Sequence, residues 1–211
     1  MSAVNATRPM GTYGLHSATT SQGLSAIRRS DCAASIWERR SPPRLERWID
    51  NVAPEHLPKA RLILRADRVC DALVEVTNLC NTPTGPERDL LIDDVSALSA
   101  IFADVMQTTY LRLRLDVVRS NACRKFHIDA VTARLICTYR GTGTQYGIST
   151  DGAEPTRIFT TPTGAPLILR GTLWPTDPPA GLLHRSPPIE GSGETRLLLV
   201  LDPVDDPEGA I

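Results

Sequence analysis

The spacing of apolar residues changes along this chain, from a helical period before Thr109 to a strand-like period after it. In RLERWIDN, Leu45, Trp48 and Ile49 recur at i, i+3 and i+4, which places them on one face of a helix. RADRVCDALVEVTNLC repeats this spacing, and TGPERDLLIDDVSALSAIFADVMQ shows it most clearly. The pattern predicts helices within residues 44–109. The apolar stripe of the longest helix consists of Leu91, Val95, Leu98, Phe102 and Val105.

After Thr109 the period becomes two. YLRLRLDVV alternates leucines with charged residues, which predicts a strand with one face exposed. Turn-forming segments such as GTG, TDGAEP and TPTGAP separate the later apolar runs. Helices followed by short strands predict an α+β fold, in which a β-sandwich or jelly-roll barrel carries the chemistry beneath an N-terminal helical layer. The other predicted strands are 123–128, 132–139, 144–148, 156–160, 165–170 and 195–201.

The same patterns predict one domain over residues 44–205, with the barrel at 110–202 and a tail at 206–211. Residues 1–43 are rich in Ser, Thr, Ala, Gly and Arg and show no sustained periodicity. We therefore expect a mobile or loosely packed leader there.

Composition narrows the class of protein. The formal net charge of −1, from 23 basic and 24 acidic residues, argues against a partner such as nucleic acid or an anionic membrane. The five cysteines are odd in number and include no CxxC pair, which favours a reducing compartment. The N-terminus lacks the apolar core of a signal peptide, and no run reaches the roughly 18–20 apolar residues of a membrane span. We expect a cytoplasmic protein.

Residues with metal-ligand chemistry occur at two places in the predicted barrel. His127 and Asp129 are two apart in CRKFHID, so in a strand their side chains point to the same side. His184, in GLLHRSPPI, follows Asp129 by 55 residues. A barrel brings early and late strands together because its strands close around a common interior. Two imidazoles and one carboxylate form the facial triad of non-haem Fe(II) oxygenases, so we predict His127, Asp129 and His184 as metal ligands.

The order of these residues resembles the 2-oxoglutarate/Fe(II) dioxygenase superfamily: His127-x-Asp129, then His184, then Arg196 after 12 more residues. The resemblance implies a double-stranded β-helix, a cupin-like relative of the jelly roll. It also implies Fe(II) on the three ligands and 2-oxoglutarate near Arg196, whose guanidinium suits a carboxylate. The implied reaction is oxidative decarboxylation of 2-oxoglutarate coupled to hydroxylation of an unknown substrate.

Other side chains are candidates for binding the cosubstrate. Tyr139 offers a hydroxyl to a carboxylate, with core packing as the alternative. Arg134 falls on the opposite face of the same predicted strand, where we expect it to be solvated or salt-bridged. Arg185 directly follows His184 and is an alternative to Arg196 as the anion-binding group.

Three segments are similar to signature segments of a bacterial family, domain of unknown function 1826: CRKFHID, RLICTYRGTGTQY and HRSPPIEGSGETRLLLVLD. The resemblance covers roughly residues 45–205 and implies no settled reaction. A loose association of that family with zinc-responsive contexts implies a role for metal. A second hypothesis is therefore a non-catalytic, zinc-homeostasis-related protein that uses the same three ligands. A third is a small-molecule-binding barrel without metal.

Cys123 offers a fourth ligand for Zn²⁺, since it shares a strand face with His127 in CRKFHID. Four residues along a strand span about 13 Å, which is too far for one ion unless the strand bends. We therefore expect Cys123 to be a small core residue.

Overall fold

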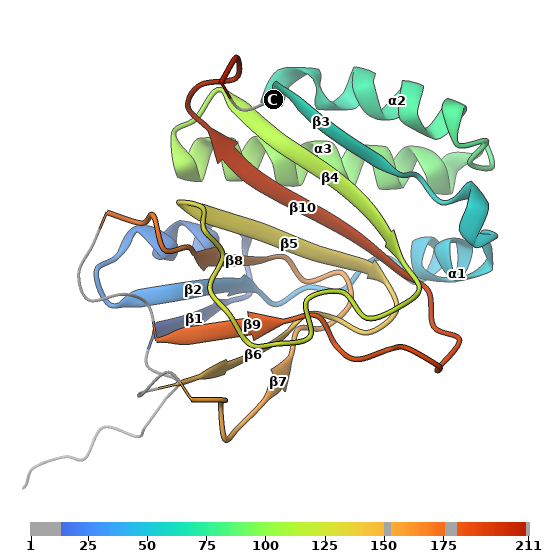
Figure 1. Cartoon of the computed structure of the whole chain (residues 1–211). Helices are drawn as coiled ribbons and strands as arrows, with labels where there is room; N and C mark the ends of the chain where they lie inside the picture. Colours follow the sequence, from blue (N-terminus) through green and yellow to red (C-terminus); the bar gives the residue numbers. More distant parts are fainter. Residues whose placement is uncertain (1–13, 150–152, 176–180, 210–211) are drawn as a thin grey trace, which may run out of the picture.

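The structure is a computed structural model that describes residues 14–149, 153–175 and 181–209. It combines helices with two β-sheets (Figure 1). The helical elements are η1 (Ser21–Arg28), α1 (Pro43–Asn51), η2 (Pro54–His56), η3 (Ala66–Arg68), α2 (Val69–Leu79) and α3 (Pro86–Met106). The strands are β1 (Gly14–Ala18), β2 (Cys32–Trp37), β3 (Ala60–Arg65), β4 (Tyr110–Val118), β5 (Ala133–Arg140), β6 (Gln145–Ile148), β7 (Phe159–Thr160), β8 (Leu167–Arg170), β9 (Leu182–Arg185) and β10 (Arg196–Val204).

The larger sheet has seven strands in the order β1-β2-β8-β5-β10-β4-β3. Strands β1 and β2 are parallel, and every other pair in this sheet is antiparallel. Strand β10 lies between β5 and β4 and is buried along almost its whole length. Segments far apart in the sequence therefore meet at β10, and side chains from β4, β5 and β10 share one surface.

Helices α1, α2 and α3 pack with the larger sheet in one apolar core. The alternation of β4 explains this packing, because Leu111, Leu113 and Leu115 are at most 1% exposed and belong to that core. Each buried leucine contributes about 1.5–3 kcal/mol relative to an exposed one. The charged residues between them necessarily lie on the opposite face of the sheet.

That opposite face packs against a second, three-stranded sheet in the order β7-β6-β9. A second apolar core, with members such as Ile136, Tyr146 and Leu167, lies between the sheets. Within the described residues the strands form these two separate sheets rather than one closed barrel. The loop between β4 and β5 joins the smaller sheet through an isolated antiparallel bridge of His127 and His184.

The prediction of an α+β chain is confirmed, and the predicted helices at 44–109 correspond to α1, α2 and α3. No helix among the described residues is long and apolar enough to cross a membrane. The helical half also contains β3, which the sequence analysis missed. The expected strand 123–128 is wrong: apart from the bridge at His127, this segment is a loop.

The prediction of a loose leader at 1–43 also needs correction. Residues 14–37 contain two strands of the larger sheet, and Leu24, Ile27 and Ala34 are fully buried. The apolar residues of this segment are few and mixed with small polar ones, so they give no periodic signal in the sequence. The pairing of β2 with β8 nevertheless places the segment in the larger sheet. Residues 1–13 lie outside the described part of the chain.

Candidate metal centre

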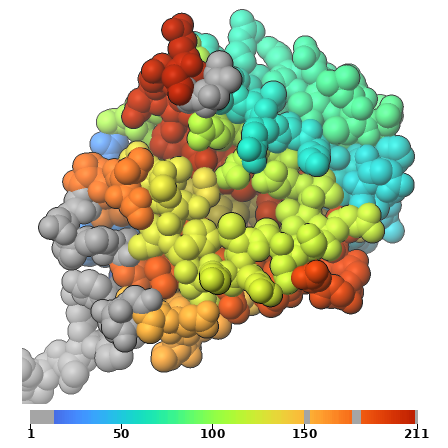
Figure 2. Space-filling view, in the orientation of Figure 1, coloured from blue at the N-terminus to red at the C-terminus, as the bar shows by residue number. Residues whose placement is uncertain are grey.

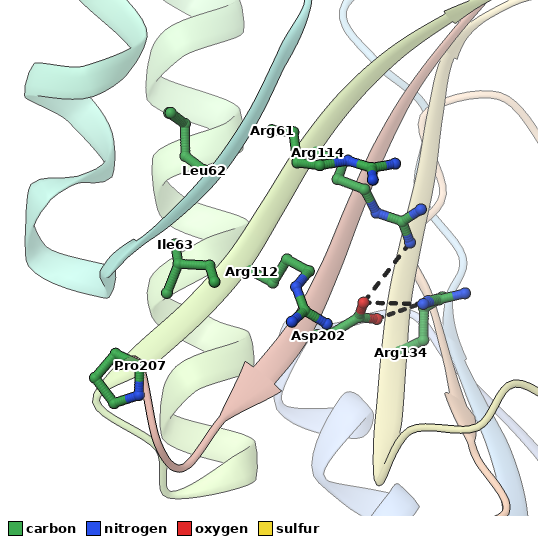
Figure 3. Close-up of a pocket in the computed structure, with 8 residues that line it drawn as sticks. All are labelled: Arg61, Leu62, Ile63, Arg112, Arg114, Arg134, Asp202 and Pro207. Atoms are coloured by element: carbon green, nitrogen blue, oxygen red, sulfur yellow. Dashed lines mark hydrogen bonds and ion pairs between the residues drawn. The ribbon is translucent and has the colours of Figure 1, made fainter. Parts of the chain in front are cut away.

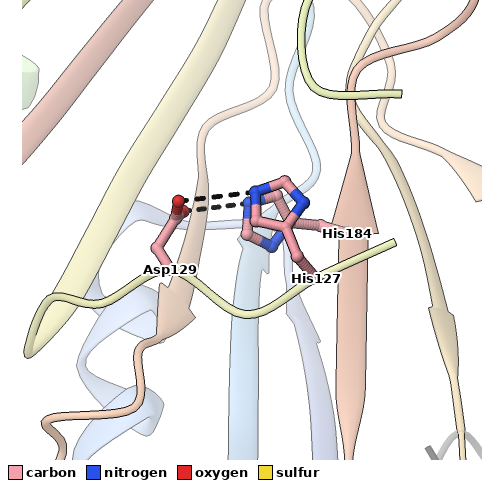
Figure 4. A group of neighbouring side chains, drawn as sticks. All are labelled: His127, Asp129 and His184. Carbon is pink, nitrogen blue, oxygen red and sulfur yellow. Dashed lines mark ion pairs between the residues drawn. The ribbon is translucent and has the colours of Figure 1, made fainter. Parts of the chain in front are cut away.

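His127 and His184 come from the loop after β4 and from β9, and they meet through their backbones. Each donates its N–H to the other's carbonyl oxygen at 3.0 Å. The imidazole ring centroids lie 4.6 Å apart with a 45° tilt. Both rings face Asp129, which continues the same loop (Figure 4). The three predicted ligands are thus brought together in one cluster.

The distances within this cluster suit a single cation. Asp129 Oδ2 lies 3.0 Å from His184 Nε2, and Asp129 Oδ1 lies 3.5 Å from His127 Nε2. Adjacent ligands held about 2.0–2.2 Å from a metal lie about 3 Å apart. Each of the three residues offers one potential ligand atom, and these three atoms all lie within 4.8 Å of one another. Asp129 Oδ2 is buried, and among the described residues it accepts no hydrogen bond of good geometry, so a cation would satisfy it.

The second nitrogen of His127 is already engaged. Its Nδ1 lies 2.8 Å from the carbonyl oxygen of Lys125. A carbonyl only accepts, so this contact favours the tautomer with a proton on Nδ1 and a lone pair on Nε2. Metal-bound histidines usually donate their other ring N–H in this way. The backbone of the loop therefore prepares Nε2 of His127 as a ligand.

Electrostatics keep Asp129 ionised and disfavour the charged form of His184. Burial acts to raise the pKa of Asp129, but His184, Arg134 and His127 outweigh it and lower that pKa to about 2. Burial also lowers the pKa of His184 below its usual range, and its contact with Asp129 opposes this only in part. An ionised carboxylate facing a neutral imidazole is the form that binds a cation.

Arg134, on β5, connects this cluster to the larger sheet. Its Nη1 lies 2.6 Å from Asp129 Oδ1, and its other nitrogens form a bidentate pair with Asp202 on β10. The prediction that Arg134 is salt-bridged is confirmed, but its contact with a candidate metal ligand was missed. Because Arg134 contacts Oδ1 of Asp129, the other carboxylate oxygen, Oδ2, faces His184.

Arg196 lies at the start of β10, on the same strand face as Leu198 and Val200, which line the cavity beside the histidines. Its side chain is fully buried, and its Nε donates to the Thr142 carbonyl at 2.6 Å. Its two terminal nitrogens have no hydrogen-bond partner among the described residues. Burial lowers the pKa of Arg196 to about 10, with Glu194 acting in the opposite direction. A buried guanidinium with two free donors is a binding group for a carboxylate.

The GTGT turn covers this arginine closely. Gly141 has a φ of +78°, which favours glycine, and a Cβ there would lie 3.0 Å from Cγ of Arg196. Arg185, the alternative anion-binding residue, instead donates from Nε to Gln145 at 2.8 Å and lies over the ring of Phe126. Arg196 therefore differs from Arg185 in having two terminal nitrogens that are buried without a partner among the described residues.

Tyr139 is not part of the cluster. It is 1% exposed in the core beneath the helices, and its hydroxyl donates to Asp94 Oδ2 on α3 at 2.6 Å. Tyr139 and Arg134 lie on opposite faces of β5, as predicted from the alternation, and Arg134 lies on the face of the candidate metal ligands. The proposed contact of Tyr139 with a cosubstrate is therefore corrected in favour of core packing.

Cys123 is exposed, so the expectation of a small core residue is wrong. The physical reason is that its segment is a surface loop rather than a strand packed on the sheet. Cys123 borders the cavity of the histidines, but its sulfur is not among the ligand atoms grouped with His127, Asp129 and His184. The four-ligand zinc set is thus not assembled among the described residues.

The cluster borders a cavity of about 160 Å³ between the two sheets. Strands β4, β5 and β10 line one side of it, and the loop after β4 lines another. Figure 2 shows the molecule hollowed on this face, beside the yellow-green segment that carries His127 and Asp129.

Comparisons with known proteins agree with this architecture. The family model "Protein of unknown function (DUF1826)" matches residues 18–202. The chain belongs to this family. Its members are defined without a reaction, so membership by itself assigns no chemistry. No curated protein sequence matches the chain.

The solved structures that share the fold include two plant dioxygenases. One is a dioxygenase for auxin oxidation from Arabidopsis thaliana, in a binary complex with 2-oxoglutarate, with a TM-score of 0.53 and 10% identity over 92% of this chain and 94% of that one. The other is a dioxygenase for auxin oxidation in rice, with a TM-score of 0.52 and 10% identity over 91% of this chain and 83% of that one. At this identity the likeness concerns the fold.

Proposed function

We propose that this protein is a non-haem oxygenase that depends on Fe(II) and 2-oxoglutarate, built on an open double-stranded β-helix. The observation that carries the proposal is the cluster of His127, Asp129 and His184, which presents two imidazoles and one carboxylate beside a cavity. This donor set is the facial triad of Fe(II) oxygenases. The fold shared with two dioxygenases, one of them bound to 2-oxoglutarate, supports the same conclusion.

The protein's own residues would hold the metal in a fixed arrangement. The carbonyl of Lys125 orients His127, and Arg134 orients Asp129. Three protein ligands leave coordination positions open for other molecules. When bound, Fe(II) together with 2-oxoglutarate would supply the activation of O₂ that this class of enzyme uses.

Arg196 would bind the carboxylate of 2-oxoglutarate remote from the metal. Its terminal nitrogens are buried and unpaired among the described residues, which is costly unless an anion is present. The fork of two N–H donors matches a carboxylate in both geometry and charge. Arg196 shares its strand face with Leu198 and Val200 of the same cavity, which orients the cosubstrate site toward the metal ligands.

We also propose a cytoplasmic location. All five cysteines are free thiols, and this is the state that a reducing compartment maintains.

Anaerobic reconstitution tests the function. The purified protein is titrated first with Fe(II) and then with 2-oxoglutarate, and a visible charge-transfer band is recorded; O₂ is then admitted and succinate is measured. We expect one Fe(II) per chain, a band that requires 2-oxoglutarate, and slow succinate release without added substrate. If Fe(II) binds but neither band nor succinate appears, the protein is a metal-binding protein rather than an oxygenase.

Two arginine variants assign the cosubstrate site. Arg196→Gln removes the unpaired donors and should weaken 2-oxoglutarate binding by at least roughly tenfold while Fe(II) still binds. Arg185→Gln is the matched control, since Arg185 is also next to the cluster but already bonded to Gln145. Equal affinity of the Arg196→Gln variant and the wild type would contradict the assignment.

A further inference from the structure

A second cavity, of about 700 Å³, opens on the outer part of the same sheet face, over β3, β4 and β10. Four arginines line it, Arg61, Arg112, Arg114 and Arg134, together with one acidic residue, Asp202 (Figure 3). Its size is within the range of about 300–1,000 Å³ found for small-molecule sites. The chain as a whole carries a net charge of −1, so this concentration of positive charge is local.

Arg114, one of these arginines, has no carboxylate within hydrogen-bond distance. Asp202 is 2% exposed, and both of its carboxylate oxygens accept hydrogen bonds from Arg134, at 2.6 and 2.9 Å. Arg114 reaches its nearest carboxylates, Asp202 and Asp116, only at 3.7 and 3.9 Å, beyond hydrogen-bond distance. Its Nε is buried and has no hydrogen-bond partner among the described residues.

Strand register brings like charges together here. Arg61 on β3 and Arg114 on β4 are directly opposite each other in the antiparallel pair. Like charges in this position destabilise a sheet unless something compensates them. Burial lowers the pKa of Arg114, and repulsion from Arg134 and Arg61 lowers it further. A bound oxyanion would relieve this repulsion and accept the unused hydrogen bonds of Arg114.

The cavity also has apolar lining residues, and it shares two arginines with the smaller cavity beside the candidate metal ligands. Ile63 and Pro207 lie on the side away from Arg134, where an apolar part of a ligand would fit (Figure 3). Arg114 and Arg134 line both this cavity and the smaller one that contains the histidines. A molecule held here would lie next to Arg134, which contacts Asp129.

We propose that this cavity is the substrate site and that the substrate is a small organic oxyanion, a carboxylate or a phosphate ester, held by Arg61 and Arg114. The assignment as substrate rests on the proposed function. The anion site itself rests on the arginines alone and can be tested separately.

Anion binding to the full-length, iron-free protein tests the proposal. Inorganic phosphate and benzoate are titrated separately by calorimetry into the wild type and into Arg61→Gln, Arg114→Gln and Arg65→Gln. Arg65 is the matched control, since it is on the same strand but pairs with Asp67 outside the cavity. Arg61 is exposed, so its variant tests the site even if loss of Arg114 impairs folding.

We expect saturable binding of at least one probe to the wild type and to Arg65→Gln, with affinity at least roughly tenfold weaker in Arg61→Gln and Arg114→Gln. Binding of phosphate alone would indicate a phosphate ester, and binding of benzoate alone a carboxylate with an apolar body. The proposal is overturned if neither probe binds the wild type saturably, or if Arg61→Gln binds both as tightly as Arg65→Gln.

The variant His127→Ala separates this proposal from the oxygenase function. It removes a metal ligand but leaves all four arginines, so it should still bind the anion probe. A protein that binds Fe(II) and 2-oxoglutarate but neither probe would refute the anion site alone. A protein that binds a probe but no Fe(II) would refute the oxygenase function alone.

Discussion

His127 and His184, 57 residues apart in the sequence, are joined by two backbone hydrogen bonds of 3.0 Å, one in each direction. This bridge connects the loop after β4 to β9. The positions of both imidazoles thus depend on main-chain pairing, which does not require a metal or the side chains themselves. The cluster is therefore preorganised, and a ligand variant should lose metal without losing the fold.

The first prediction concerns the metal ligands. His127→Ala and His184→Ala should each weaken Fe(II) binding by more than roughly 100-fold, because loss of an outer-shell partner alone costs about 10–100-fold. Anaerobic calorimetry measures the affinity, and circular dichroism checks the fold. His56→Ala is the control, since the imidazole of His56 lies beside the carbonyl of Cys80 and is not one of the candidate ligands. Unchanged metal content in both ligand variants would remove the metal site from consideration.

The second prediction concerns Arg134. Arg134→Gln leaves Asp202 buried without its bidentate partner, which should destabilise the fold by about 3–5 kcal/mol. Urea unfolding measures the change, and Asp202→Asn in the same chain should recover part of it because the unpaired charge is then absent. Arg65→Gln, which breaks an exposed pair, should have little effect on stability. Equal stability of the two single variants would show that the buried pair is not important.

The third prediction concerns Tyr139. Tyr139→Phe removes one hydrogen bond to Asp94, which still keeps its two bonds from Arg39 at 2.6 and 2.7 Å. We expect a loss of about 1 kcal/mol in unfolding free energy and no change in the affinity for 2-oxoglutarate. Urea unfolding and the charge-transfer titration measure the two quantities. A weaker 2-oxoglutarate affinity would return Tyr139 to the cosubstrate site.

The fourth prediction concerns alkaline pH. Burial raises the pKa of Cys137 to about 12, and burial also raises the pKa of Tyr139 well above its usual value. In the unfolded chain these groups lose their protons near pH 9 and 10. Their contribution to stability is therefore complete below about pH 8 and is lost progressively as the pH rises above 9. Unfolding free energy measured from pH 8 to 11 should fall, and less steeply for Cys137→Ala.

The same burial predicts the reactivity of the thiols. At pH 8, Cys137 and Cys32 should resist iodoacetamide in the native protein, whereas the exposed Cys70 and Cys123 should react. Mass spectrometry of the alkylated protein identifies the sites. Rapid native labelling of Cys137 would contradict its complete burial.

Several features followed from local pattern. The apolar stripe of α3 and the alternation of β4 were predicted from sequence because each depends on residues within one element. The conformation of 123–128 was predicted wrongly as a strand, because CRKFHID lacks the alternation that distinguishes a strand from an extended loop. Only pairing with β9 defines its conformation, and only at His127.

The arginines of β4 show the same limit of prediction from local pattern. The polar face of β4 was expected to be exposed, yet the Arg114 side chain is only 18% exposed, since the smaller sheet and the loop after β4 lie over that face. The alternation specified which residues share a face but not what covers the face. A run of arginines on one strand face, in a chain of nearly zero net charge, was the available signal for an anion site.

By itself, the sequence determined the type and order of the candidate site residues, because residue chemistry and spacing are local properties. These residues are His127, Asp129, His184 and Arg196. Tertiary structure decided which atoms of these residues are usable. It turned Nε2 of His127 toward Asp129, assigned Arg134 to orient that carboxylate, and left the terminal nitrogens of Arg196 unpaired among the described residues. Two of these outcomes depend on contacts between distant segments: Asp202, 68 residues away, anchors Arg134, and the carbonyl of Thr142, 54 residues away, holds Nε of Arg196. The pattern within a single element does not encode such contacts.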